Sequence, residues 1–67
     1  MDSQEELGLQ FKEAREKKKL TQADVAKQSD MTVTYYAMIE RGEVNPSLEK
    51  VNKILAVLGL KLSIKEK

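Results

Sequence analysis

The densest run of basic side chains in this sequence is Lys17-Lys18-Lys19, with Arg15 and Lys12 just upstream. Such a cluster can bind nucleic-acid phosphates although the net charge of the chain is only +1, because local charge sets the local field. The alternative is the solvated end of a helix, where the helix dipole favours cations. We favour this alternative, because charge runs are usually solvated faces.

The sequence lacks the side chains on which most catalytic and metal sites depend. It has no cysteine and no histidine, so a disulfide or thiolate site is excluded and a zinc site would need carboxylates alone. The usual general base and nucleophile are missing as well. We therefore expect no enzyme, no metal and no cofactor.

The size and hydropathy of the chain limit its organisation. Its 67 residues make one small domain, near the lower limit for a self-sufficient core. No apolar run approaches the roughly 20 residues that span a bilayer, and the acidic, polar N-terminus is the reverse of a secretory signal. These features predict one domain over residues 1–67, a cytoplasmic location and no membrane partner.

Two short helix patterns, each opened by a threonine, lie within residues 21–42. Thr21 can cap the first helix, and Asp24 adds a favourable charge at its positive end. The second pattern stops at Gly42, a residue that readily adopts the left-handed cap conformation. Helices joined by so tight a turn cross steeply, so the second helix projects and can enter a DNA major groove.

The spacing of apolar residues and caps predicts four helices, over about residues 4–18, 22–29, 33–41 and 48–58. Ser3 with Glu6 has the capping-box spacing, Ser47 caps the fourth helix, and Gly59 ends it. The side chains expected in the core are Leu7, Phe11, Ala14, Val25, Ala26, Met31, Tyr36, Ile39, Leu48, Val51, Ile54, Leu55 and Leu58. Val33, Thr34, Ala37 and Met38 fall on the opposite side of the third helix.

Residues 60–65 change from a helical to an alternating pattern, with Leu60, Leu62 and Ile64 on one side. This pattern predicts a half-buried strand. A lone strand cannot satisfy its own backbone, so the simplest partner is the same segment of a second copy, which would make a homodimer. The alternative is a frayed C-terminus. We favour the dimer, because proteins usually cover an exposed edge of this kind.

Several segments together resemble the Cro/C1-type (XRE) helix-turn-helix family: LTQADVA at residues 20–26, Tyr36, ERG at 40–42 and NPSL at 45–48. The match covers most of the chain, from about residue 7 to 58. It implies an all-α, lambda-repressor-like domain of four helices, or five with a short extra turn. The ending at 58–64 is similar to HipB-like antitoxin regulators, whose partners are HipA-type kinase toxins.

This resemblance implies a homodimeric transcriptional repressor, with the third helix in the major groove of palindromic double-stranded DNA. The residues that would face base edges are Thr32, Val33, Thr34, Ala37 and Met38. Those that would contact phosphates are Thr21, Gln22, Tyr35, Arg41, Asn45 and Ser47, with a partly exposed ring as the alternative for Tyr35. Arg15 and Glu40 match positions of a partly buried ion pair between the first and third helices.

The recognition face departs from the usual pattern in its chemistry. Arginine, lysine, asparagine and glutamine are the bidentate base readers, and none occurs between Thr32 and Glu40. Apolar side chains can contact thymine methyl groups, so we expect A·T-containing half-sites with much of the affinity from phosphates and DNA shape. Alternatively, this apolar face binds a protein such as a HipA-like toxin, and DNA binding is weak.

Overall fold

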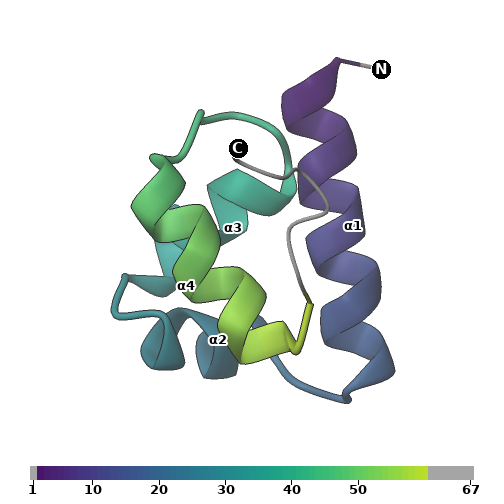
Figure 1. Ribbon diagram of the computed structural model, residues 1–67, viewed down its shortest axis with the longest axis vertical. Helices are drawn as coiled ribbons and strands as arrows, with labels where there is room; N and C mark the ends of the chain where they lie inside the picture. Colours follow the sequence, from purple (N-terminus) through teal and green to yellow (C-terminus); the bar gives the residue numbers. More distant parts are fainter. Residues whose placement is uncertain (1, 61–67) are drawn as a thin grey trace, which may run out of the picture.

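The computed structural model describes residues 2–60, which fold into four α-helices (Figure 1). These are α1 (Ser3–Lys17), α2 (Gln22–Gln28), α3 (Val33–Glu40) and α4 (Leu48–Leu58). Helix α3 packs against α1 and α2, and α4 packs against the same two helices. The predicted all-α architecture is confirmed for these residues. The predicted strand at 60–65 lies, apart from Leu60, outside the described residues.

Each helix begins at a side chain that caps its first turn. For α1 this residue is Asp2: its Oδ1 accepts a hydrogen bond from Glu5 N at 2.8 Å, and Glu5 Oε1 accepts one from Asp2 N at 3.3 Å. The predicted capping box of Ser3 with Glu6 is therefore wrong, because the same spacing occurs one residue earlier. Thr21 and Asp24 form a full reciprocal box at the start of α2, with distances of 3.0 and 2.8 Å.

The four described helices all end in the same backbone motif. In each case a backbone amide just past the helix donates to the carbonyl five residues earlier, and the residue before that amide has positive φ. The residues with positive φ are Lys19 (59°), Asp30 (62°), Gly42 (75°) and Gly59 (70°). These caps end each helix abruptly, and the one at Asp30 makes the tight turn between α2 and α3.

The core lies where the four helices meet. Its buried members are Phe11, Val25, Ala26, Tyr36, Ile39, Val51, Ile54, Leu55 and Leu58. The predicted core positions Leu7, Ala14 and Met31 are partly buried against this cluster. The prediction for Leu48 is wrong: it remains 65% exposed, because the apolar stripe of α4 reaches the core only one turn later, at Val51.

Helix α1 approaches the end of α3 closely at Gly8. A Cβ atom built on this glycine would meet the backbone oxygen of Ile39 and that of Glu40, the latter at 2.5 Å. Both obstacles are backbone atoms, which cannot rotate away as a side chain does. No feature of the sequence around Gly8 predicts this contact, since it depends on how two distant helices pack.

The Gly8→Ala variant tests whether this approach is required. Alanine favours a helix over glycine by roughly 1 kcal/mol, so without the contact the variant would be more stable. We expect instead that the clash lowers the free energy of unfolding by about 1–3 kcal/mol in urea denaturation. Gln10→Ala, at an exposed position of α1, is the control and should change stability by less than about 0.5 kcal/mol. Equal or greater stability of Gly8→Ala would contradict the packing.

Candidate nucleic-acid interface

Helix α3 has one buried and one outward side. Tyr36, Ile39 and Glu40 face the interior and are buried. On the other side, Thr34 is exposed and Val33 is 46% exposed. Ala37 and Met38 are half-buried. The predicted base-contacting side chains of α3 therefore share a surface that solvent reaches.

Three hydroxyl residues of the predicted interface act as helix caps. Thr32 Oγ1 accepts a hydrogen bond from Tyr35 N at 3.1 Å, and Ser47 Oγ accepts one from Lys50 N at 3.2 Å. Thr21 caps α2 in the same way. A hydroxyl that accepts a bond from the backbone still has its own proton to donate. Capping therefore leaves each of these groups able to donate to a phosphate or a base.

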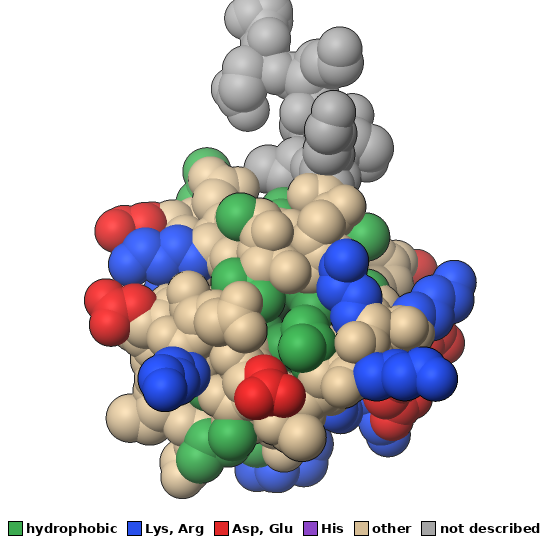
Figure 2. Space-filling view, turned by 90° about the horizontal axis from the view of Figure 1, so that it is seen from below, with side chains coloured by type: hydrophobic (Ala, Val, Ile, Leu, Met, Phe, Trp, Pro, Cys, Tyr) green, Lys and Arg blue, Asp and Glu red, His purple; other side chains and the backbone are tan. Residues whose placement is uncertain are grey.

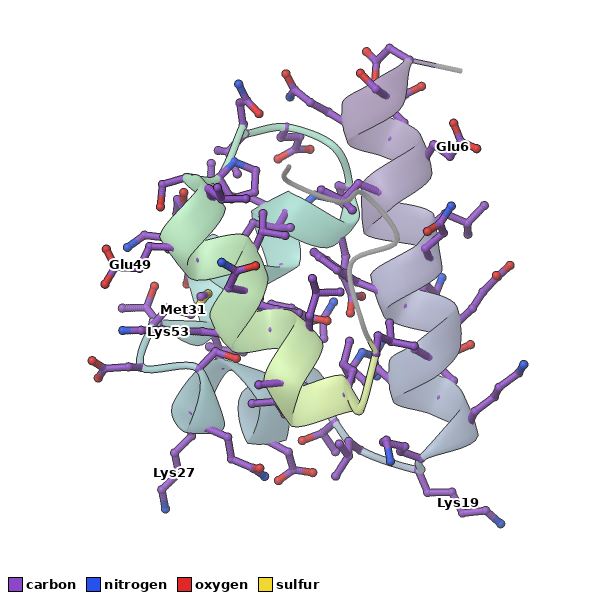
Figure 3. All side chains as sticks on the ribbon, in the orientation of Figure 1. Glu6, Lys19, Lys27, Met31, Glu49 and Lys53 are labelled. Carbon is purple, nitrogen blue, oxygen red and sulfur yellow. The ribbon has the colours of Figure 1, made fainter. Side chains whose placement is uncertain are left out.

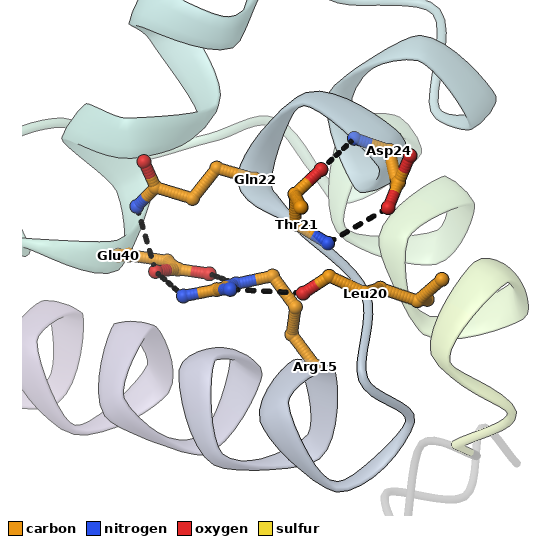
Figure 4. Close-up of polar contacts among 6 residues, drawn as sticks. All are labelled: Arg15, Leu20, Thr21, Gln22, Asp24 and Glu40. Atoms are coloured by element: carbon orange, nitrogen blue, oxygen red, sulfur yellow. Dashed lines mark hydrogen bonds and ion pairs between the residues drawn. The ribbon is translucent and has the colours of Figure 1, made fainter.

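The inner side of α3 is fixed by an ion pair between Arg15 of α1 and Glu40 (Figure 4). Arg15 Nε donates to Glu40 Oε2 at 2.7 Å, and Nη2 donates to Oε1 at 3.1 Å. The two side chains are only 11% and 3% exposed. The remaining terminal nitrogen, Nη1, donates to the carbonyl of Leu20 at 3.0 Å, just before α2. The pair predicted from the sequence thus joins α1, α3 and the approach to α2.

Gln22, at the start of α2, also reaches this pair (Figure 4). Its Nε2 donates to Glu40 Oε1 at 2.9 Å, and the side chain is half-buried. The sequence predicts a phosphate contact for Gln22 and gives no sign of this bond. An amide nitrogen carries two protons, so the second proton and the Oε1 atom are not used by Glu40. The carboxylate of Glu40 is therefore held by groups from both neighbouring helices.

The surroundings of Glu40 determine its ionisation. Burial acts to raise the pKa of its carboxyl group, but the hydrogen bonds from its neighbours, Arg15 above all, and the charge of Arg15 outweigh burial and lower the pKa. The hydroxyl of Tyr36 is buried nearby and has no hydrogen-bond partner in the described part of the chain. Burial, reinforced by the charge of Glu40, raises the pKa of this phenol. Both effects favour a charged Glu40 and a neutral Tyr36 at neutral pH.

The flank of α3 carries the remaining predicted phosphate contacts. The ring of Tyr35 is half-buried, and the ammonium of Lys50 lies 5.8 Å from its centre, at cation–π distance. Arg41 and Asn45 are exposed, and Arg41 forms an ion pair with Glu43. The sequence makes no prediction for Lys50 or Glu43. Residues two apart do not face each other on a helix, so the Arg41–Glu43 pair could not be predicted from its spacing.

The basic run at residues 17–19 spans the end of α1 and its cap, which lies away from α3 in Figure 1. Lys19 and Lys27 project from the lower edge of the domain in Figure 3. Figure 2 views the domain from below, toward this lower edge. On the face seen there, basic side chains are spread around the rim among acidic ones and do not form a single patch. This arrangement favours the solvated helix end over a phosphate-binding cluster.

The geometry defines a class of domain: two short helices joined by a tight turn, with the second clamped on its inner side and open on its outer side. This is the arrangement of a helix-turn-helix module. No helix in residues 2–60 has the length and apolar character needed to cross a membrane.

Known proteins agree with this class. A family model described as helix-turn-helix matches residues 11–65. The chain is 35% identical over 57 residues to the immunity repressor protein of Bacillus phage phi105, covering 85% of this chain and 40% of that protein. It is 47% identical over 49 residues to the control protein C.MunI of Mycoplasma sp, covering 73% of this chain and 66% of that protein.

Two solved structures share the fold. The clp gene regulator ClgR from Corynebacterium glutamicum superposes with a TM-score of 0.83 at 28% identity, over 85% of this chain and 61% of that one. The restriction-modification controller protein C.AhdI from Aeromonas hydrophila gives 0.82 at 30% identity, over 85% and 86%. The chain belongs to the helix-turn-helix family, in its Cro/C1-type (XRE) branch of DNA-binding transcriptional regulators, which is not a family of enzymes.

The ion pair predicts a specific acid sensitivity. Because the folded-state pKa of Glu40 is lowered, its contribution to stability is present above the unfolded value of 4.5 and is lost as the pH falls below it. Glu40→Gln should lose about 3–5 kcal/mol at pH 7, since Arg15 is left buried and unpaired, and should lose less on acidification than the parent. Urea denaturation between pH 7 and pH 3 measures both quantities.

Glu43→Gln is the matched control for this prediction, since it also breaks a bidentate arginine pair, but an exposed one. Exposed pairs contribute at most about 1 kcal/mol. If both variants cost the same at pH 7, the pair at Glu40 has no special structural role.

Proposed function

We propose that this chain is a transcriptional repressor that binds palindromic double-stranded DNA as a homodimer, with α3 in the major groove of each half-site. One observation carries the proposal: the inner side of α3 is fixed by Glu40, while Val33, Thr34 and Met38 on the other side remain accessible. A helix held in this way presents its outer side chains to a groove in a defined orientation.

In the proposed complex, α3 reads bases mainly through apolar contacts. Val33, Ala37 and Met38 would lie against thymine methyl groups, and the hydroxyls of Thr32 and Thr34 would donate or accept single hydrogen bonds. Each such contact discriminates less than the roughly 1–3 kcal/mol of a bidentate pair. The preferred half-sites would therefore contain A·T pairs, with DNA shape adding to the selection.

Phosphate contacts would supply much of the affinity. The candidates are Thr21, Gln22, Tyr35, Arg41, Asn45 and Ser47; Tyr35 lies within α3, and the others lie before or after it in the sequence. Two of the hydroxyls and the Gln22 amide keep a proton free for an oxygen acceptor, as their geometry above indicates. Lys50, beside the Tyr35 ring, joins these candidates because its ammonium group is on the same flank.

The relatives support a regulator. One is named an immunity repressor and another a control protein, and one of the solved structures is a gene regulator. This chain spans 40% of the phage repressor and 66% of C.MunI, so only part of each relative is compared. None of these names supports an antitoxin with a HipA-like partner, and that alternative becomes an outcome of the experiment below.

Selection of binding sites from random-sequence duplexes tests the proposal. We expect enriched sites with two A·T-containing half-sites about 10 base pairs apart, and binding that falls steeply with salt. Met38→Ala should bind the selected site several-fold more weakly, with little change on random duplex, because it removes a base contact. Lys53→Ala, an exposed change in α4, is the control. Negligible binding even at low salt would favour a protein-binding module and reject the repressor.

The homodimer is a further part of this proposal. The alternation of Leu60, Leu62 and Ile64 supports it, and Leu60 is 39% exposed in the described chain, so it is accessible to a second copy. A chain ending at Gly59 should sediment as a monomer and lose cooperative binding to the two half-sites. Ser63→Ala, on the other side of the predicted strand, should remain dimeric. A dimer that survives the truncation would place the interface elsewhere.

A further inference from the structure

We infer that Glu43 competes with DNA for Arg41 and so weakens binding to duplexes of every sequence. The inference rests on the proposed function, since it concerns a phosphate contact of that interface. Arg41 Nε donates to Glu43 Oε2 at 2.9 Å, and Nη2 donates to Oε1 at 3.0 Å. The side chains are 56% and 50% exposed, so solvent reaches both groups and a phosphate is not sterically excluded from them.

The backbone holds both residues in place. Arg41 caps α3, and the amide of Glu43 donates to Met38 O at 2.9 Å. Gly42 between them has φ of 75°, and a Cβ there would meet the backbone of Glu5 in α1. The turn is therefore fixed against another helix, and the two side chains leave it side by side. This pair is a product of the cap, unlike two long side chains that meet by chance.

The geometry of the pair makes the competition direct. A guanidinium binds a carboxylate and a phosphate in the same way, through an edge that carries two parallel N–H groups. Glu43 occupies the edge formed by Nε and Nη2. A phosphate must either displace the carboxylate from this edge or bind Arg41 beside an uncompensated negative charge. Both routes cost binding energy, and neither depends on the base sequence.

The other exposed ion pair in the described chain differs in quality. Lys53 Nζ lies 3.9 Å from Asp30 Oδ2, which is too far for a hydrogen bond. The Arg41 pair is bidentate, which is the geometry in which an exposed pair contributes measurably. Glu43 is therefore the carboxylate whose removal should change the availability of a cation most.

The test compares Glu43→Gln with Glu49→Gln, which removes the same charge from an exposed site in the first turn of α4 (Figure 3). Affinity is measured on the selected site and on a random duplex of equal length, at one salt concentration. We expect Glu43→Gln to bind both duplexes about three- to fivefold more tightly, and Glu49→Gln to change less than about twofold. In an Arg41→Gln background, the Glu43→Gln change should have no effect.

Several results would overturn the inference. Equal tightening by both single variants would mean that only total charge matters. The same gain in the Arg41→Gln background would mean that Glu43 repels DNA without acting through Arg41. If the parent binds DNA and Glu43→Gln does not bind more tightly, only this inference fails. If the parent and Glu43→Gln both fail to bind DNA, the proposed repressor function is rejected together with this inference.

Discussion

The buried carboxylate of Glu40 is the interaction on which the arrangement of the helices depends. It lies at the end of α3 and receives hydrogen bonds from Arg15 of α1 and Gln22 of α2. A charge removed from water is tolerated only where its partners are in place, so few orientations of α3 satisfy this group. Apolar packing alone would permit more of them, since it is non-directional. We interpret the pair as the element that selects one angle for α3.

Two glycines let α1 come close enough to α3 for Arg15 to reach Glu40. Gly8 lies against the carbonyls of Ile39 and Glu40, and Gly42 lies against Glu5. Gln4 adds a hydrogen bond from its side-chain nitrogen to the Gly42 carbonyl at 3.3 Å. The C-terminal end of α3 is therefore enclosed by α1. The side chains at its start, Thr32 and Val33, remain exposed.

The sequence predicts most of the fold because the signals for the helices are local. Residue type alone predicts the caps at Thr21, Ser47 and Gly42. The spacing of apolar residues around Tyr36 identifies the buried face of α3. Local signals fail where the outcome depends on packing. Asp2 and Ser3 both have the capping-box spacing, and periodicity cannot choose between them. Leu48 has the right period but remains exposed, and this depends on how α4 packs against the other helices.

The candidate site was predictable to a smaller extent, for a physical reason. Residue type and position identify the outer side of α3 and the Arg15–Glu40 pair, since both follow from a recognisable motif. The bond from Gln22 to Glu40 joins residues 18 apart, and only the packed helices bring them together. Lys50 over the Tyr35 ring likewise joins two helices. Polar side chains on a surface have several partners within reach, and the sequence does not rank them.

The chemistry of α3 sets a limit on how such a protein can be specific. Thymine-methyl contacts and single hydrogen bonds each discriminate weakly, so one half-site selects little. When a rigid symmetric pair binds two half-sites, the free energies by which each half-site discriminates against wrong bases add, so the two specificity ratios multiply. Contacts to phosphates add affinity without selection. An interface with weak base readers therefore gains from modest phosphate affinity, since tight binding to random DNA would hold the protein away from its site. Exposed cations with carboxylate neighbours, as at Arg41, satisfy this requirement without any change in the reading face.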